Sequence, residues 1–213
     1  MNLLLARPTG PTSDLHRHGV CWVVAFGIGL VTLFVHGYRL SAAPDMLSDE
    51  LLYLLVSRNV ARGAGLLADS GYFFWHPPLY VLTEGAFVKV AGLLDHDVLT
   101  ALYSVRWLNV VFSALTSGLL VLFGYRLHSF KAGLLMAGLF LFDPYVQRIN
   151  RRAMMETLGL LLSLLALYVF FARQARPTGW QQIGAGACFG LAVLTKELLA
   201  FQLLALIAFG AWS

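Results

Sequence analysis

Long apolar stretches separated by short polar segments run along most of the chain. Four of them are uninterrupted by charge: residues 20–38, 107–125, 157–172 and 177–195. The hydrocarbon core of a bilayer is about 30 Å thick, so one helical crossing needs about 20 apolar residues. These four stretches are therefore predicted to be membrane-spanning helices.

Two further apolar stretches are interrupted or incomplete. Residues 132–147 contain Asp143 and Pro144 near their end, and residues 198–213 are still apolar where the sequence stops. Counting both as crossings brings the predicted total to about six. The last stretch has no polar flank, so we expect the 213 residues to be a fragment of a longer chain. The alternative is a short final helix that Trp212 anchors at the membrane interface.

The segment between the first two spans, about residues 41–102, is predicted to be an external loop with two helices lying in the membrane interface. Residues 76–94 are apolar enough to cross, but they carry Glu84 and Lys89 in the middle. A charge at the bilayer centre costs about 2.5–3.5 kcal/mol, which argues against a crossing. Residues 46–62 mix charged side chains with leucines, a pattern typical of an interfacial helix.

The distribution of charge predicts the orientation. With six crossings, the N-terminus and the loops 126–131 and 173–176 share one side, which carries six basic residues and a single acid, Asp14. The positive-inside rule makes this side cytoplasmic. All ten remaining Asp and Glu residues fall on the external side or at the membrane edge that faces it, as do the three arginines of residues 148–152.

The composition supports a membrane protein and excludes several other classes. Hydrophobic residues make up 59% of the chain and charged residues 12%, whereas a soluble domain has roughly 45–50% and about 25%. We therefore predict an all-α, polytopic membrane protein in which residues 1–213 form one transmembrane module. A net charge of +4 without a basic run offers nucleic acid nothing to bind. Cys21 and Cys188 lie in apolar stretches and are interpreted as small packing residues.

The candidate chemistry lies in three polar patches on the external side. The first patch, just after the first span, contains Asp49, Glu50 and, one turn later, Tyr53. Adjacent residues on a helix point about 100° apart, so one acid can act as a base toward a substrate while the other holds structure, for example through an arginine. The alternative is that both acids simply solvate a loop.

The second and third patches follow later spans. In the second, Arg151 and Arg152 precede Glu156 at the start of a helix. Arginine suits a phosphate or a carboxylate, and ionisable groups at a membrane edge are often functional; the alternative is an interfacial cluster that reaches toward the headgroups. The third patch is Lys196 with Glu197, where the lysine can also simply cap a helix or pair with its neighbour.

His76 is a further candidate, because the two prolines that follow it restrict the backbone at this point. One histidine is no metal site, and the chain has no pair of His or Cys at ligand spacing, no phosphate-binding glycine-rich loop and no nucleophile elbow. We therefore expect no metal and no cofactor. If residues 76–94 do not cross the membrane, the patches share one face; if they did cross, Asp49 and Glu156 would lie on opposite sides.

Together these motifs resemble the membrane glycosyltransferases of the GT-C superfamily, close to the protein O-mannosyltransferases and the bacterial transferases that add aminoarabinose to lipid A. The resemblance rests on five segments in order, which cover roughly residues 42–197: SDELLYLLVSRNVARGAG, HPPLYVL, VRWLNVVFSAL, DPYVQRINRRAMMETLGLLL and LAVLTKE. It implies an enzyme that moves a sugar from a polyprenyl-phosphate donor to a hydroxyl of a protein, lipid or glycan acceptor at the external face of the plasma membrane.

The resemblance also implies roles for individual residues. Asp49 matches the acid that deprotonates the acceptor hydroxyl, and Glu50 matches the second letter of the same motif. Glu156 stands where relatives often have an Asp as the acid of the second external loop. His76 is expected to face the donor phosphate, and Lys196 matches a lysine near the lipid phosphate.

Tyr53, Arg151 and Arg152 complete the expected substrate-binding set, and one of the two arginines matches an arginine of the family. A carboxylate near the acceptor and positive charge near the leaving phosphate suit a single displacement, which inverts the anomeric centre. The alternatives are a transport or assembly subunit without catalysis, or an inactive truncated remnant of such a transferase. An enzyme requires Asp49 and the groups of the other patches around one cavity.

Overall fold

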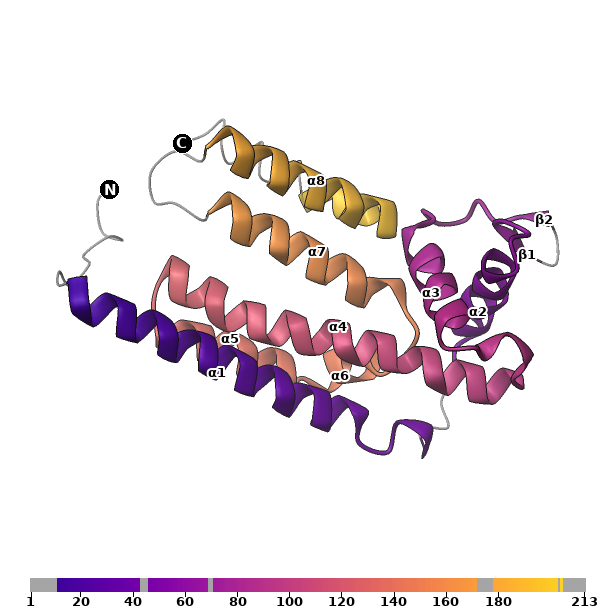
Figure 1. Cartoon of the computed structure of the whole chain (residues 1–213), viewed down its shortest axis with the longest axis horizontal. Coiled ribbons are helices and arrows are strands. Elements are labelled where there is room, and N and C mark those ends of the chain that lie inside the picture. The colour runs from indigo at the N-terminus through magenta and orange to yellow at the C-terminus, as the bar shows by residue number, and fades with distance from the viewer. Residues whose placement is uncertain (1–10, 43–45, 69–70, 172–177, 203, 205–213) are drawn as a thin grey trace.

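The structure, a computed structural model, describes residues 11–42, 46–68, 71–171, 178–202 and 204. Almost all of them are helical, as predicted. The long helices lie side by side and alternate in direction (Figure 1). They are α1 (Pro11–Gly37), α4 (Val98–Leu127), α5 (Phe130–Phe142), α7 (Met155–Phe170) and α8 (Gly179–Thr195).

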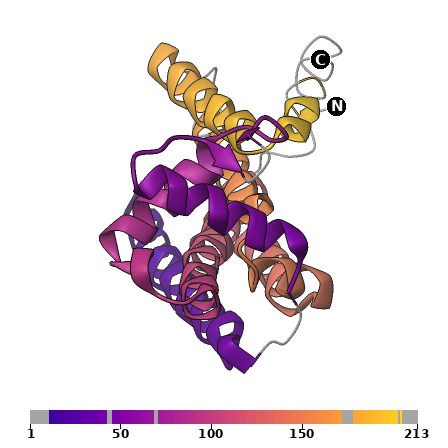
Figure 2. The same cartoon turned by 90° about the vertical axis from the view of Figure 1, so that its right-hand side faces the viewer.

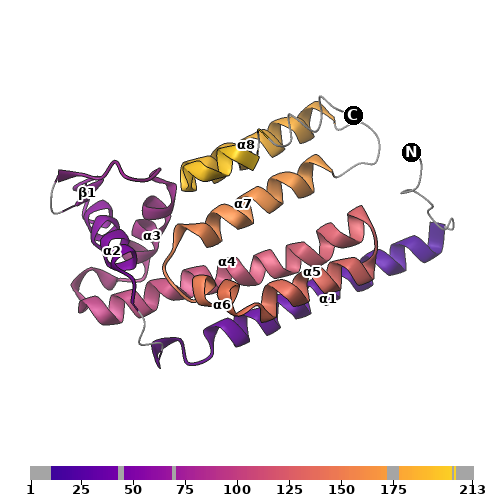
Figure 3. The ribbon, with the colours of Figure 1, turned by 180° about the vertical axis from the view of Figure 1, so that it is seen from behind.

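The short elements gather at one end of this helix bundle, as the opposite views of Figure 1 and Figure 3 both show. Figure 2 looks at this end and has α2 crossing in front of the long helices. The short elements are α2 (Ser48–Ala61), α3 (Leu79–Val90), α6 (Pro144–Asn150), the strands β1 (Leu67–Ala68) and β2 (Gly71–Tyr72), and the 3-10 turns η1 (Leu40–Ala42), η2 (Leu93–Asp95) and η3 (Glu197–Leu199).

Polar residues in the sequence determine where several helices begin. Asp97, Ser129, Asp143 and Thr178 precede α4, α5, α6 and α8, and the side chain of each accepts a hydrogen bond from a backbone N–H of the first turn. Such caps satisfy amides that have no partner inside the helix. At Asp143 the following Pro144 cannot continue α5 but suits the first position of α6, so the chain breaks there.

Buried polar side chains connect the long helices in the middle of the bundle. The Thr32 hydroxyl of α1 donates to the Ser117 hydroxyl of α4 at 2.7 Å. Nδ1 of His36 lies 2.9 Å from the Ser113 hydroxyl, and its Nε2 lies 3.5 Å from the Leu141 carbonyl of α5. Because lipid offers these groups no partner, such bonds favour association of the helices that carry them.

Two glycines allow α4 and α5 to approach closely. A Cβ atom at Gly124 would lie 2.5 Å from the Cα atom of Gly133, and one at Gly133 would lie 2.4 Å from the Val121 carbonyl oxygen. Real side chains do not fit at such distances, so the hairpin of α4 and α5 depends on both glycines.

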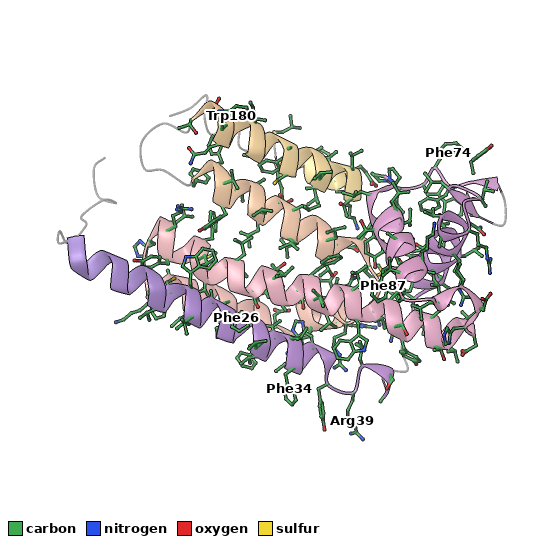
Figure 4. All side chains as sticks on the ribbon, in the orientation of Figure 1. Phe26, Phe34, Arg39, Phe74, Phe87 and Trp180 are labelled. Atoms are coloured by element: carbon green, nitrogen blue, oxygen red, sulfur yellow. The ribbon has the colours of Figure 1, made fainter. Side chains whose placement is uncertain are left out.

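Large apolar side chains cover the outside of the bundle. Phe26 and Phe34 of α1 are each 70% exposed and point away from the other helices (Figure 4). Trp180, at the start of α8, is also exposed at the end of the bundle opposite α2 and α3. A surface of this kind is stable against lipid tails, with aromatic rings such as tryptophan near the headgroups.

The number of long spans is smaller than predicted. Within the described part of the chain, two helices, residues 19–42 and α4, are long and apolar enough to cross a membrane, and α6 with α7 makes a third only as a pair bent by 107°. The described residues therefore contain fewer long spans than the six expected for the whole chain. The break at Asp143 leaves α5 with 13 residues, about 20 Å at 1.5 Å per residue. Most of the predicted last crossing, residues 198–213, lies outside the described residues.

The two helices expected in the external loop are present as α2 and α3. At 14 and 12 residues they are about 20 Å long, too short to cross a bilayer. The chain enters and leaves this loop at the same end of the bundle (Figure 1). Glu84, which argued against a crossing, is fully buried between protein elements. The small hairpin β1–β2 between α2 and α3 was not anticipated.

Candidate active site

A fully buried ion pair joins α2 to α4 at the end of the bundle that holds the short elements. Arg106 donates from Nε to Oε1 of Glu50 at 2.9 Å and from Nη2 to Oε2 at 2.8 Å, and neither side chain is exposed. A bidentate contact between two planar groups fixes their relative orientation. Glu50 therefore holds the first turn of α2 against α4, and its carboxylate is directed at protein rather than at open space.

Glu50 also reaches the turn that precedes α7. The Ala153 N–H donates to Oε1 of Glu50 at 2.8 Å, across 103 positions of the chain, and the Leu47 N–H donates to Oε2 at 3.2 Å. Both carboxylate oxygens thus have two partners each. The start of α2 and the start of α7, which carry the first and second polar patches, are consequently held next to each other.

Asp49 has different surroundings from its neighbour. Its side chain is exposed in the first turn of α2, and the Ser48 hydroxyl donates to its Oδ1 at 3.3 Å. An exposed carboxylate with free lone pairs can accept a proton from a hydroxyl that comes within hydrogen-bond distance.

Tyr53, one turn after Asp49, lies at the centre of an aromatic cluster. Its ring centroid is 6.3 Å from that of Phe73, 6.0 Å from that of His76 and 5.9 Å from that of Tyr80, and all three contacts are edge-on. Aromatic pairs favour this arrangement over face-to-face stacking. The cluster holds the partly exposed His76 ring against α2 in a defined orientation.

Two ion pairs connect the remaining polar groups. Nζ of Lys196, at the end of α8, contacts Oε1 of Glu156 in the first turn of α7. Nδ1 of His76 lies 3.5 Å from Oε1 of Glu197. Lys196 therefore pairs with an acid of another helix rather than with its neighbour. The second oxygen of Glu156, Oε2, is buried and has no hydrogen-bond partner in the structure.

Burial and several acids together affect the pKa of Tyr53. Burial raises the pKa of Tyr53 most, and the charges of Asp49, Glu156 and Glu197 raise it further, in that order. A carboxylate influences a neighbouring group in this way only at short range. The contact of Glu50 with the Ala153 N–H brings the first turn of α2, which carries Asp49, to the turn before α7, which carries Glu156.

The two arginines of the second patch have different environments. Nη2 of Arg151 donates to the Tyr38 carbonyl at 2.8 Å and to the Arg39 carbonyl at 3.4 Å, where α1 has just ended and Arg39 has a φ of 51°. A guanidinium there stabilises the last carbonyls of the helix. The Arg152 side chain is buried. Arg151 is thus bound to backbone at the end of α1, away from the aromatic cluster.

Sequence reasoning missed the polar stripe of α4. Arg106 was treated only as the boundary of a span, yet it and several later polar residues at helical spacing are all buried on one face: Arg106, Asn109, Ser113, Thr116 and Ser117. Their spacing of three or four residues is visible in the sequence and was the available signal. Ser113 and Ser117 of this stripe contact α1. Arg106 and Asn109, nearer the start of α4, contact Glu50 and the turn before α7.

The chemical capacity of the site follows from these groups. This end of the bundle has an exposed acid, Asp49, a lysine paired with Glu156, and a histidine whose Nδ1 lies 3.5 Å from Glu197. Such an arrangement can accept a proton and bind a phosphate. Among the described residues, no group of three or more His, Cys, Asp and Glu side chains could hold a metal ion.

Comparison with known proteins identifies the family. Residues 76–213, about two thirds of the chain, match the model of the dolichyl-phosphate-mannose-protein mannosyltransferase family. The chain belongs to this family. The protein is therefore an integral membrane glycosyltransferase of the GT-C type, as its motifs predicted. No curated protein and no solved structure matches the chain at a significant level.

The mannosyltransferase match includes part of the candidate site. His76, Glu156 and Lys196 lie inside the matched segment, whereas Asp49 and Tyr53 precede it. The contact of Tyr53 with His76, and that of Glu50 with the turn before α7, bring the unmatched part of the site to the matched part.

Proposed function

We propose that this mannosyltransferase-family protein transfers a sugar from a polyprenyl phosphate to an acceptor hydroxyl, with inversion at the anomeric carbon. The observation that carries the proposal is that Glu50 holds the first turn of α2, which carries Asp49, against the turn before α7. Glu156 of α7 pairs there with Lys196, and Tyr53 of α2 contacts the His76 ring. A base and positive charge at one place are what this reaction needs.

In the proposed step, Asp49 accepts the proton of the acceptor hydroxyl as the hydroxyl oxygen attacks the anomeric carbon. The new carbon–oxygen bond forms while the bond from the anomeric carbon to the phosphate oxygen breaks. The electron pair of the broken bond stays on the phosphate, whose charge Lys196 and His76 stabilise. Attack and departure occur on opposite faces of the sugar in one displacement, so the anomeric configuration inverts.

Glu156 and Glu197 have a supporting role in this proposal. Glu156 holds Lys196, so that the ammonium group is oriented before the donor phosphate arrives, and Glu197, whose Oε1 lies 3.5 Å from Nδ1 of His76, stabilises the imidazole when it is protonated. Preorganised charge is effective because the protein does not have to rearrange during the reaction. Arg152 is a further candidate for binding the donor phosphate. Tyr53 is proposed to line the place where the acceptor and the sugar meet.

The proposed location rests on the short basic connection between α4 and α5. The basic residues at the α4–α5 connection, Arg126 and Lys131, lie at the end of the bundle opposite the candidate site. By the positive-inside rule the site then faces the outside of the plasma membrane and the N-terminus faces the cytoplasm. The donor reaches it from the lipid, and the acceptor is a protein, lipid or glycan. Because the family is named for mannose on dolichyl phosphate and for protein acceptors, these are the first substrates to test.

The test uses membranes that contain the full chain and dolichyl phosphate mannose with a radiolabelled sugar. Release of dolichyl phosphate, and label in the protein, lipid and glycan fractions, are measured for wild type, Asp49→Asn and Asp95→Asn. Asp95 is an exposed acid of the same loop and serves as the matched control. We expect Asp49→Asn to be slower by about 10²–10⁴-fold and Asp95→Asn to match wild type. Equal rates for Asp49→Asn and wild type would contradict the proposal.

A further inference from the structure

The side-chain amide of Asn109 lies at the centre of a buried network that reaches the second polar patch. Asn109 is fully buried in α4, one turn after Arg106. Its Nδ2 donates to the carbonyl oxygen of Arg152 at 2.5 Å and to that of Met154 at 2.6 Å. Its Oδ1 accepts a hydrogen bond from the Tyr80 hydroxyl at 3.2 Å. The orientation of the amide is determined by these partners, because two carbonyl oxygens require the NH₂ group.

Asn109 and Glu50 together bind the backbone of the turn before α7. The carbonyl groups of residues 152 and 154 are held by Asn109, and the intervening N–H of Ala153 is held by Glu50. Three consecutive residues are thus fixed by side chains of other elements. The turn ends at Met154, and Glu156 follows in the first turn of α7. Any shift of this turn moves the Glu156 carboxylate with it.

The other side of the Asn109 amide reaches the aromatic cluster. Tyr80 packs against Tyr53, its hydroxyl is bound by Asn109, and it lies in α3 directly after the His76-Pro-Pro segment. One buried amide therefore connects the start of α7, which carries Glu156, with the segment that carries His76.

We propose that Asn109 is a positioning residue for the transfer reaction, acting through Glu156. The expected loss of kcat rests on the proposed function, whereas the expected release of the turn before α7 rests on the structure alone. Asp is nearly the same size as Asn but lacks the NH₂ group, so Asn109→Asp places an acceptor against two carbonyl oxygens and releases the turn. Displacement of Glu156 misplaces Lys196, and a misplaced catalytic group slows the reaction even without any lost contact to the substrate.

The experiment compares Asn109→Asp with a matched control, Asn59→Asp. Asn59 also donates from Nδ2 to a backbone carbonyl, that of Leu67 at 2.8 Å, but this bond lies between α2 and the hairpin rather than at the turn before α7. Hydrogen–deuterium exchange of detergent-solubilised full chain is followed by mass spectrometry over residues 151–158. kcat and KM for dolichyl phosphate mannose are measured per folded protein, in the wild-type and Glu156→Gln backgrounds.

We expect Asn109→Asp to speed exchange over residues 151–158 and to lower kcat by about tenfold to a hundredfold with little change in KM. In the Glu156→Gln background it should lower kcat no further, because both changes act on one group. Asn59→Asp should leave both quantities unchanged. Unchanged exchange over residues 151–158, or an independent loss on top of Glu156→Gln, would overturn the proposal. If wild type does not use the donor, the proposed function fails, and the exchange data still decide whether Asn109 positions the turn.

Discussion

Lys196, at the end of α8, is paired with Glu156, at the start of α7, forty positions earlier in the chain. Both side chains are partly exposed, so their attraction is weakened by water and adds little to stability. The pair instead orients an ammonium group beside an acid at the end of the bundle where α2 and α3 lie. This suggests that the contact matters more for activity than for folding.

Replacement of Lys196 by Met tests this distinction. We expect the temperature of unfolding in detergent to change by only a few degrees, while release of dolichyl phosphate slows by about a hundredfold or more, because the leaving phosphate loses a stabilising charge. Lys89→Met removes an exposed lysine of α3 and should leave both quantities unchanged. A Lys196→Met protein with wild-type turnover would exclude the lysine from the reaction.

Replacement of Arg106 tests the buried pair with Glu50. Arg106→Met leaves the Glu50 carboxylate buried beside an apolar side chain, which costs about 3–5 kcal/mol of folding free energy. Changing both residues, Glu50→Leu with Arg106→Met, removes the stranded charge and should restore only part of the loss, because the N–H groups of Ala153 and Leu47 lose their acceptor. Thermal unfolding in detergent measures both. A single variant as stable as wild type would contradict the structural role given to this pair.

Glu84 predicts a dependence of stability on pH. Burial, and secondarily the charge of Glu50, raise the pKa of Glu84 well above its ordinary value, which is about 4.3. In the unfolded chain the group ionises near that ordinary value, while in the folded protein it stays protonated, so its contribution is fully present at low pH and is lost as pH rises through the folded pKa. Each pH unit in this window costs about 1.4 kcal/mol.

Glu84→Gln cannot ionise and should abolish this slope. Measured by thermal unfolding between pH 5 and 8, the variant should gain stability relative to wild type as pH rises. Asp95→Asn, at an exposed position, serves as the control. Parallel pH profiles for wild type and Glu84→Gln would show that the Glu84 carboxyl does not have the raised pKa.

Close approach of α4 and α5 gives a prediction about Gly124. Ala at this position brings a Cβ atom to 2.5 Å from the Gly133 backbone, so the helices must separate and the folded protein loses stability. Gly138 lies in α5, and a Cβ atom added there would have no neighbour within 4 Å. Gly138→Ala should therefore be neutral or stabilising by up to about 1 kcal/mol, since Ala is the better helix former. Equal unfolding temperatures for the two variants would contradict the predicted clash.

Much of the fold could be predicted because local signals determine it. The lengths of the apolar stretches locate the long helices, and Asp143 with Pro144 marks a break that the structure contains. Charged residues within residues 46–62 and 76–94 argued against crossings there, and the helices in these segments, α2 and α3, have 14 and 12 residues. The described residues contain fewer long spans than expected, because Asp143 and Pro144 end α5 early and hydropathy does not reveal the effect of such a break. α5 ends after 13 residues, although the apolar stretch continues to residue 147.

The pairing of charged residues could not be predicted. The sequence indicated only the neighbouring Glu197 as a partner of Lys196, whereas the packing of α8 against α7 pairs it with Glu156. Arg106 and Glu50 are 56 positions apart, and the sequence indicates neither their contact nor the third partner, the Ala153 N–H. Such contacts depend on how helices pack, which local patterns do not encode.

The central claim is that Asp49, early in the chain, and Lys196, late in it, serve one reaction. A double-mutant cycle on release of dolichyl phosphate tests it, with wild type, Asp49→Asn, Lys196→Met and the double variant measured on equal amounts of folded protein. When two groups act as a unit, removing the second one costs little once the first is gone. We therefore expect the double variant to be about as slow as the slower single variant. A loss in the double variant equal to the product of the two single losses would contradict a shared site.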